Sequence, residues 1–302
     1  MHTARTTTET TDNRVVDYRQ AGPTVLRMLV GAQLRRLREA MSVTREEAGE
    51  TIRASTSKIS RLELGRTGFK LRDVEDLLTR YGVHDEAERA PLLSLAEQAN
   101  APAWWHYYAD VVPQWFEPFL GLEQAACVIR TYEVQFVPGL LQTEDYARAV
   151  IRAGRGGVTP EEAERRVDLR MRRQRLLRKT PAPKLWAVVD ETALRRPIGG
   201  VATMKAQLKH IIEIAELKHV TVQLMPFSSG NHAGSAGPST ILRFPENELP
   251  DIVYLEQLTG ALYLDKPADT QRYWHVMNRL GVEAEQPRET IQHLHRILRD
   301  FS

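Results

Sequence analysis

Apolar side chains recur at helical spacing in the first third of the chain. From about residue 24 they lie on one face of a helix, with arginines and glutamates on the other faces. The residues of this apolar face are Val30, Leu34, Leu37 and Met41. Three shorter helical patterns follow, over about 44–52, 55–64 and 71–81. The spacing predicts a compact bundle of four or five short helices over residues 24–83.

The helix ends in this region carry residues that favour them. Thr44 can cap a second helix, and Glu47, three residues later, completes a capping box with it. Ser55 offers the cap of a third helix, and Gly65 can end that helix in a left-handed conformation. We therefore expect two short helices joined by a tight turn at residues 53–54.

The flanking segments differ from this bundle in composition. Residues 1–23 contain few apolar side chains, which predicts a disordered arm. Residues 84–103 contain a further helical pattern that leads into an aromatic stretch, and we interpret them as a connector helix. A third of the aromatic residues of the chain lie within 104–119, which indicates the core of a second domain.

Helical and strand-like patterns are interspersed in this second domain, residues 104–302. The helical patterns cover about 121–132, 143–153, 160–178, 201–217, 269–280 and 287–301. The strand-like runs are 184–190, 220–227, 239–244, 251–257 and 260–265. Because the last four runs have short connections, antiparallel hairpins are expected. The predicted fold class is an N-terminal all-α bundle of four to five helices, followed by a larger α+β domain with a mainly antiparallel sheet.

Composition limits the compartment and the chemistry. The chain has 302 residues, a formal net charge of +2 and one cysteine, Cys127. A single cysteine excludes an internal disulfide framework and a zinc site built from several thiolates. The N-terminus has no apolar core of a signal peptide, and no later stretch reaches the roughly 18 uncharged apolar residues of a membrane span. We expect a cytoplasmic protein without membrane contact.

The small net charge hides a basic cluster in the helical bundle. Residues 53–72 contain six basic residues and one acid, a local charge of +5. Two helices joined by a tight turn, the second polar at its start, describe a helix-turn-helix whose second helix enters the major groove of DNA. The alternative is a solvated basic hairpin. The residues expected to contact DNA are Arg53, Ser55, Thr56, Ser57, Lys58, Arg61, Arg66 and Lys70.

These residues suit different parts of a DNA duplex. Ile59 and Leu62 must be buried, which aims the polar residues of the third helix outward. Arg61 can donate two hydrogen bonds to a guanine, and Lys58 can reach a guanine or a phosphate. The serine and threonine hydroxyls suit phosphate or less selective base contacts.

The stretch "TREEAGETIRASTSKISRLELG" resembles the XRE-type, lambda-repressor-like helix-turn-helix regulators. The resemblance places Arg45 at the first groove-facing position of the second helix and implies a structural ion pair between Arg38 and Glu63. Two unrelated surface charges are the alternative for that pair. The sequence departs from the family at Gly49, where a small alanine is usual, and at Arg53, where glycine is common in the turn.

The second domain resembles the C-terminal domain of unknown function of the actinobacterial WhiJ-like regulators, most specifically at "VPGLLQTEDYA". Such regulators are often encoded beside a small partner protein, sometimes in a relation like that of toxin and antitoxin. The resemblance implies a domain that binds a partner or senses a ligand. Leu140, Leu141 and Gln142 would lie on the rim of such a site, and His232 would lie in a glycine-rich lid. The alternatives are a purely structural loop and a mobile hairpin loop.

Catalysis is the rival class of function. Asp190 and Glu191 end a strand, but adjacent strand residues point to opposite faces, so they do not easily share one site. His293 and His295 have the wrong spacing for one metal on a helix. The basic run at 165–179 suits a second phosphate-contacting surface or a solvated helix face. We expect no enzyme, no metal and no cofactor.

The expected function is transcriptional regulation by sequence-specific binding of double-stranded DNA, as a homodimer, with a C-terminal domain that senses a small molecule or binds a small partner protein. The alternative is an antitoxin-like protein whose main role is protein–protein interaction. A dimer is favoured because two half-sites one helical turn apart double the contacts to DNA.

Overall fold

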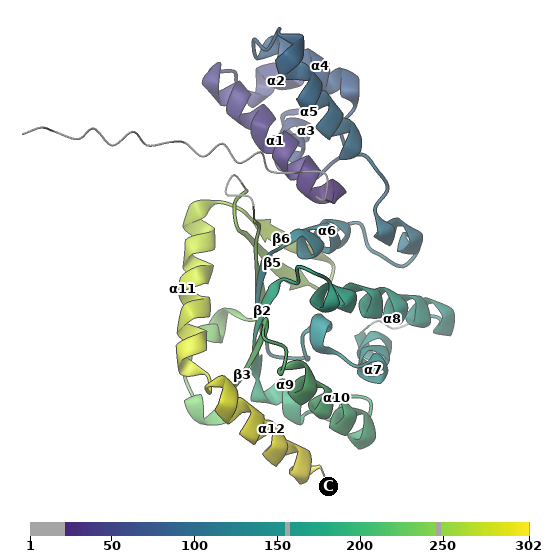
Figure 1. The fold of residues 1–302 in the computed structure, drawn as a ribbon, viewed down its shortest axis with the longest axis vertical. Coiled ribbons are helices and arrows are strands. Elements are labelled where there is room, and N and C mark those ends of the chain that lie inside the picture. Colours follow the sequence, from purple (N-terminus) through teal and green to yellow (C-terminus); the bar gives the residue numbers. More distant parts are fainter. Residues whose placement is uncertain (1–21, 155–157, 246–248, 302) are drawn as a thin grey trace, which may run out of the picture.

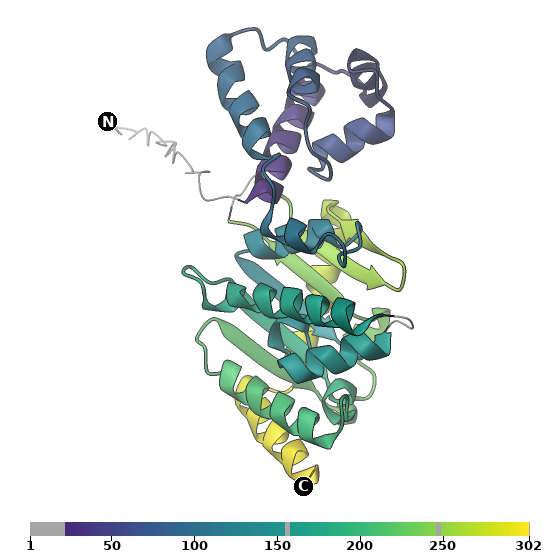
Figure 2. The ribbon, with the colours of Figure 1, turned by 90° about the vertical axis from the view of Figure 1, so that its right-hand side faces the viewer.

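The computed structural model describes residues 22–154, 158–245 and 249–301. The predicted arm at 1–23 lies almost wholly outside these ranges. The described chain forms a small helical head and a larger α/β domain, stacked along the long axis of the molecule (Figures 1 and 2). The helices of the head are α1 (Pro23–Ala40), α2 (Arg45–Thr51), α3 (Thr56–Glu63), α4 (Leu71–Arg80) and α5 (Glu86–Gln98).

Burial in the head follows the apolar pattern of the sequence. Leu34, Ile59 and Leu78 are at most 1% exposed and belong to one core shared by all five helices. The helix of the segment 84–103 is part of this head, since α5 packs against α1 and α4. Thr44 and Glu47 form the capping box at the start of α2.

Gly31 lets α1 and α3 approach each other closely. A Cβ atom at this position would lie 2.4 Å from the carbonyl oxygen of Leu62 and 2.7 Å from that of Glu63. Both atoms are backbone, so α3 would have to move as a whole. The small residue therefore fixes the depth at which α3 lies against α1.

We expect Gly31→Ala to lower the free energy of unfolding by about 1 to 3 kcal/mol, as overpacking does in other cores. Denaturant-dependent hydrogen exchange of the α1 and α3 amides measures this. Gly154→Ala is the control, since a Cβ there would meet nothing within 4 Å. Equal stability of both variants would show that α3 is free to shift.

The second domain contains one six-stranded sheet with the order β3-β2-β1-β4-β5-β6. β1, β2 and β3 run parallel, and β1, β4, β5 and β6 are joined by three antiparallel pairings, so the sheet is mixed and mostly antiparallel. The strands are β1 (Val128–Glu133), β2 (Lys184–Asp190), β3 (Val220–Met225), β4 (Ser239–Arg243), β5 (Ile252–Gln257) and β6 (Gly260–Leu264).

Two details of the sequence prediction are wrong. The segment 121–132 is not one helix, because its second half is β1, the strand between the parallel and antiparallel halves of the sheet. The run 220–227 does not join a hairpin with the strands that follow, because β3 pairs with β2 in parallel at the far edge. Parallel pairing needs long crossovers, and helices supply them between β1 and β2 and between β2 and β3.

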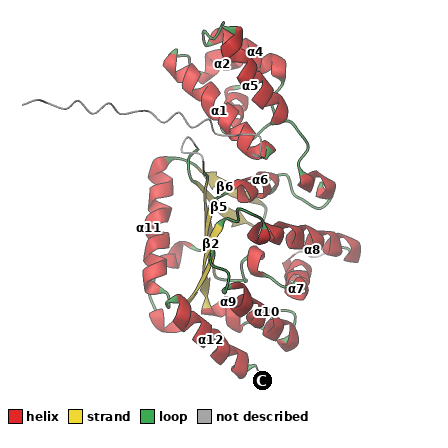
Figure 3. Cartoon of the chain, viewed as in Figure 1, coloured by secondary structure: helices red, strands yellow, loops and turns green. Residues whose placement is uncertain are grey.

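Helices cover both faces of the sheet (Figures 1 and 3). On one face, α11 packs its Met277 against Val188 and Ile241 of the sheet. The other face carries a larger core covered by the remaining helices of the domain, and α12 closes the β3 edge beside α10. The helices of the domain are α6 (Glu117–Ala125), α7 (Glu144–Gly154), α8 (Pro160–Gln174), α9 (Glu191–Arg195), α10 (Val201–Ile214), α11 (Pro267–Glu283) and α12 (Pro287–Asp300).

The helix α1 belongs to both cores. Leu26 and Val30 face the head, whereas Val25 and Met28 join the core of the second domain. At the crossing of α1 with α6, Gly121 contacts Thr24 so closely that no side chain would fit between them. The first turns of α1 are therefore buried in both cores at once, and this continuous helix ties the head to the second domain.

Candidate nucleic-acid interface

The turn between α2 and α3 is tight. Arg53 has a φ of 54°, which is the left-handed region that costs any residue other than glycine some free energy. The turn is held by a 2.8 Å hydrogen bond from the amide of Ala54 to the carbonyl of Gly49. A Cβ on residue 49 would lie 2.6 Å from the carbonyl oxygen of Ala54. The glycine that departs from the family pattern thus makes room for this turn.

The turn directs the start of α3 into solvent. Ser55 caps the helix by accepting a hydrogen bond from the amide of Lys58. Ile59 and Leu62 are 1% and 2% exposed and fix the opposite side of the helix in the core of the head. The exposed side carries Ser55, Thr56, Ser57 and Arg61.

Three of the basic residues expected at DNA have partners within the chain. Lys58 donates from Nζ to Oδ2 of Asp73 at 2.7 Å, and Arg45 donates from Nε to Oε2 of Glu63 at 3.0 Å. The guanidinium group of Arg66 donates to a backbone carbonyl of the second domain. The described chain offers no side-chain partner to Arg53, Arg61 and Lys70, which are exposed.

Glu63 joins three helices of the head. Arg38 of α1 donates from Nε and Nη2 to its two carboxylate oxygens and from Nη1 to the carbonyl of Val43. The hydrogen bond to Glu63 raises the pKa of Arg38 above its ordinary value. Arg45 of α2 binds the same carboxylate. Because Arg38 and Glu63 are 7% and 5% exposed, this buried ion pair locks the end of α3 against α1 and α2.

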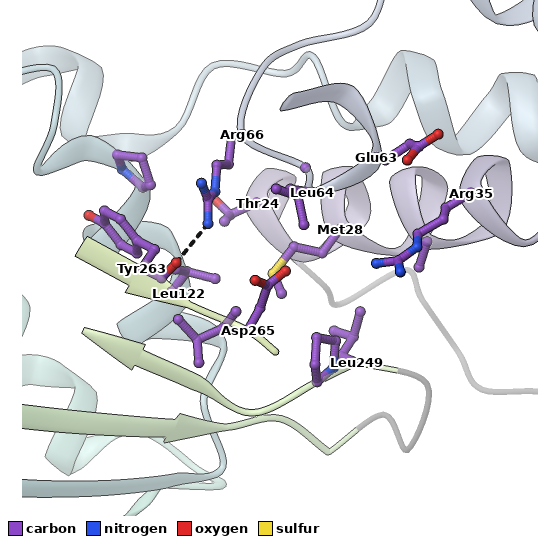
Figure 4. Close-up of a pocket in the computed structure, with 15 residues that line it drawn as sticks. Thr24, Met28, Arg35, Glu63, Leu64, Arg66, Leu122, Leu249, Tyr263 and Asp265 are labelled. Carbon is purple, nitrogen blue, oxygen red and sulfur yellow. Dashed lines mark hydrogen bonds between the residues drawn. The ribbon is translucent and has the colours of Figure 1, made fainter. Parts of the chain in front are cut away.

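The junction between the domains holds Arg66 (Figure 4). Its Nη2 donates to the carbonyl oxygen of Tyr263 in β6 at 2.8 Å, and its guanidinium carbon lies 5.9 Å from the centre of the Tyr263 ring. A small cavity of about 90 Å³ lies beside it, lined by apolar side chains such as Met28, Leu122 and Leu249. Arg66 therefore couples the end of the α3 segment to the second domain.

Two family models match the chain. One is described as a helix-turn-helix domain and matches residues 29–92. The other is described as a domain of unknown function, DUF5753, and matches residues 116–296, more than half of the chain. The chain belongs to the DUF5753 family. No curated protein and no solved structure matches it.

The two matches confirm the resemblance to a helix-turn-helix regulator with a C-terminal domain of unknown function. They support DNA binding and transcription regulation by the head. No helix among the described residues is long and apolar enough to span a membrane.

The candidate site residues of the DUF5753 domain lie in two separate places. Leu140, Leu141 and Gln142 are at most 4% exposed, so they do not form a surface rim. Leu140 and Gln142 line a pocket that is partly open to solvent, whereas Leu141 belongs to the core. His232 lies elsewhere, with its ring edge-on to Tyr132, in a 3-10 turn that packs against α11.

The carboxylates considered for catalysis have structural contacts. Asp190 caps α9 by accepting a 2.8 Å hydrogen bond from the amide of Thr192. Glu191 accepts hydrogen bonds from Arg195 and from the amide of Phe227. Among the described residues, no group of three or more histidine, cysteine, aspartate or glutamate side chains could hold a metal ion.

Proposed function

We propose that this protein is an XRE-type transcriptional regulator that binds a specific DNA sequence through α3 and acts as a homodimer. The observation that carries the proposal is the exposed side of α3, with hydroxyls at its start and Arg61 in its last turn, while Ile59, Leu62 and Glu63 hold the helix from behind. A helix presented in this way suits the major groove, where side chains near its start read base edges.

The basic residues divide into two roles. Arg61 is the residue that reads a base, since its guanidinium group is exposed and has no partner among the described residues. Arg53 and Lys70 flank α3 and suit phosphate contacts. Lys58, Arg45 and Arg66 keep intramolecular contacts in this arrangement, so their part in DNA binding requires those contacts to be exchanged.

The experiment starts from the DNA that the purified protein retains from a pool of random duplexes. On the enriched sequence, Arg61→Ala should weaken binding by about 1 to 3 kcal/mol and relax the preference at one base position. Lys70→Ala should weaken binding to all sequences alike, since a phosphate contact carries no sequence information. Arg288→Ala in α12 is the matched control and should bind as the parent protein does. Parent-like affinity and preference in Arg61→Ala would refute the assignment.

We further propose that the DUF5753 domain senses a small molecule and passes the signal to the head through α1. The support is the large pocket of this domain and the helix α1, whose residues belong to both cores. A catalytic role is not part of this proposal, since Asp190 and Glu191 serve as helix cap and hydrogen-bond acceptor.

A further inference from the structure

A large pocket, partly open to solvent, lies between the sheet of the DUF5753 domain and α8. Its volume is about 620 Å³, within the range of sites that take a small organic molecule. Its apolar wall includes the aromatic side chains of Trp115, Phe116, Phe119 and Tyr254. Figure 2 shows α8 crossing the sheet on this side.

The sheet presents a graded floor to the cavity. Residues two apart on one strand share a face, so Ile129, Thr131 and Glu133 of β1 all point to this side. Thr131 pairs with Thr240, and Thr240 pairs with Tyr254. Two residues further along the strands, the same register places Glu133 and Glu256 in one row across the sheet. The floor thus changes from apolar to hydroxyl to carboxyl along the strands.

The opposite wall is basic. Arg166, Arg170 and Arg173 lie at helical spacing on one face of α8, and all three line the cavity. The basic run at 165–179 is therefore not simply a solvated outer face, because this part of it lines the pocket. Its outer face carries Arg165, which pairs with Asp110 in an exposed contact.

The charges of the cavity are only partly compensated. Arg173 forms two 2.8 Å hydrogen bonds with the carboxylate of Glu123. Arg170 donates to the neutral amide oxygen of Gln142 at 2.7 Å, and no carboxylate of the described residues lies within ion-pair distance of it. Burial is the main cause, and the neighbouring Arg173 the second, that lowers the pKa of Arg170 to about 10. The group therefore stays charged at neutral pH.

The acids on the floor, Glu133 and Glu256, favour the charged form of Arg170 but do not form an ion pair with it. Burial, and then the neighbouring Glu256, raise the pKa of Glu133 to about 8, so this carboxyl is mainly protonated at pH 7. Arg170 therefore has the neutral amide of Gln142 as its direct partner and no ion-paired carboxylate among the described residues. A buried cation without an ion-paired partner is costly, and groups with strongly shifted pKa values cluster at functional sites.

We propose that this cavity binds a small organic acid, whose oxyanion pairs with Arg170 and whose apolar body lies against Phe116, Phe119 and Tyr254. A guanidinium group suits a carboxylate or another planar oxyanion because it can donate two parallel hydrogen bonds. The inference deepens the proposed sensing function and rests on it for its biological role. Binding itself is measured without DNA, so failure of the DNA experiment leaves this test intact, and the reverse also holds.

The test uses two probes that share one aromatic body. 8-Anilinonaphthalene-1-sulfonate carries an anion, and N-phenyl-1-naphthylamine is the same molecule without the sulfonate. Both are titrated against the full chain at pH 7, and fluorescence gives affinity and stoichiometry. We expect one sulfonate probe per chain, bound at least about tenfold more tightly than the neutral probe, since a charge-assisted hydrogen bond adds to the affinity of the anion alone.

Variants then assign the anion site. Arg170→Gln should weaken the sulfonate probe about tenfold or more and leave the neutral probe unchanged, whereas Arg170→Lys should lose less because it keeps the charge. Arg175→Gln, an exposed arginine directly after α8, is the matched control and should change neither affinity. Glu133→Gln mimics the protonated carboxyl and should also retain the sulfonate probe.

Three results would overturn the proposal. They are equal affinity of the parent protein for the two probes, an unchanged sulfonate affinity in Arg170→Gln, and an equal loss in Arg170→Gln and Arg175→Gln. If Arg170→Gln does not fold, as judged by circular dichroism, the comparison of Arg170→Lys with Arg175→Gln decides in the same way.

Discussion

Glu63→Gln is expected to lower the free energy of unfolding of the helical head by about 3 to 5 kcal/mol, the usual result when one partner of a buried ion pair is removed. The substitution keeps the shape of the side chain but removes the buried counter-charge of Arg38, which is 7% exposed and keeps only a 3.4 Å contact with the half-exposed Glu39. It also weakens the contact of Arg45 with α3. Denaturant-dependent hydrogen exchange of the α1, α2 and α3 amides reports the loss within the head.

The control for Glu63→Gln is Glu39→Gln. Glu39 pairs with Arg35 at 2.8 Å, but both side chains are about half exposed, so the expected loss is about 0 to 1 kcal/mol. Binding to the enriched DNA sequence should fall in Glu63→Gln, because the end of α3 is no longer held, and should persist in Glu39→Gln. A similar small loss of stability in both variants would show that burial does not strengthen the Arg38–Glu63 contact.

The head could be predicted well because its signals are local. The capping box of Thr44 and Glu47 spans three residues, and the burial of Ile59 and Leu62 follows from their spacing on one helix. Helix caps and helical periodicity act within one or two turns, so a single sequence contains them in full.

The strand β1 could not be recognised because the residues that surround it come from distant parts of the chain. Its burial does not alternate cleanly, since helices cover both faces of the sheet, and Val128, Thr131 and Tyr132 also fit helical spacing. The parallel partner β2 begins more than fifty residues later. Strand order in a mixed sheet depends on such distant pairings, and the sequence pattern does not contain them.

The same reason limits the prediction of the DNA-contacting residues. Lys58 finds its acid 15 residues away, Arg45 finds its acid 18 residues away, and Arg66 binds a carbonyl 197 residues away. Basic residues on a predicted helix look equally available in a sequence. Only the fold separates those with internal partners from Arg61, which remains exposed.

The helix α8 shows the largest difference between sequence and structure. Its arginines suggested a solvated face, but three of them line a partly open pocket opposite carboxyl groups from β1 and β5. These acids are distant in the sequence from α8, so no helical pattern could reveal the arrangement. The charge balance of the cavity is a property of the fold, and it determines the second large prediction.

Glu123→Gln is expected to lower the free energy of unfolding of the DUF5753 domain by about 3 to 5 kcal/mol. The Arg173 and Glu123 side chains are 9% and 5% exposed, and the substitution leaves two guanidinium groups, Arg173 and Arg170, side by side without a carboxylate partner. Urea unfolding followed by tryptophan fluorescence measures this loss, because all five tryptophans lie beyond residue 103.

The same helix provides the matched control. Asp110 accepts two 2.7 Å hydrogen bonds from Arg165 of α8, a geometry close to that of Glu123 and Arg173, but the side chains are 55% and 34% exposed. Asp110→Asn should therefore leave the free energy of unfolding nearly unchanged. Replacing both members of the buried pair, as Glu123→Leu with Arg173→Met, should recover most of the stability lost in Glu123→Gln, since no isolated charge then remains. Equal losses in Glu123→Gln and Asp110→Asn would contradict the view that the interior of this cavity is poorly compensated.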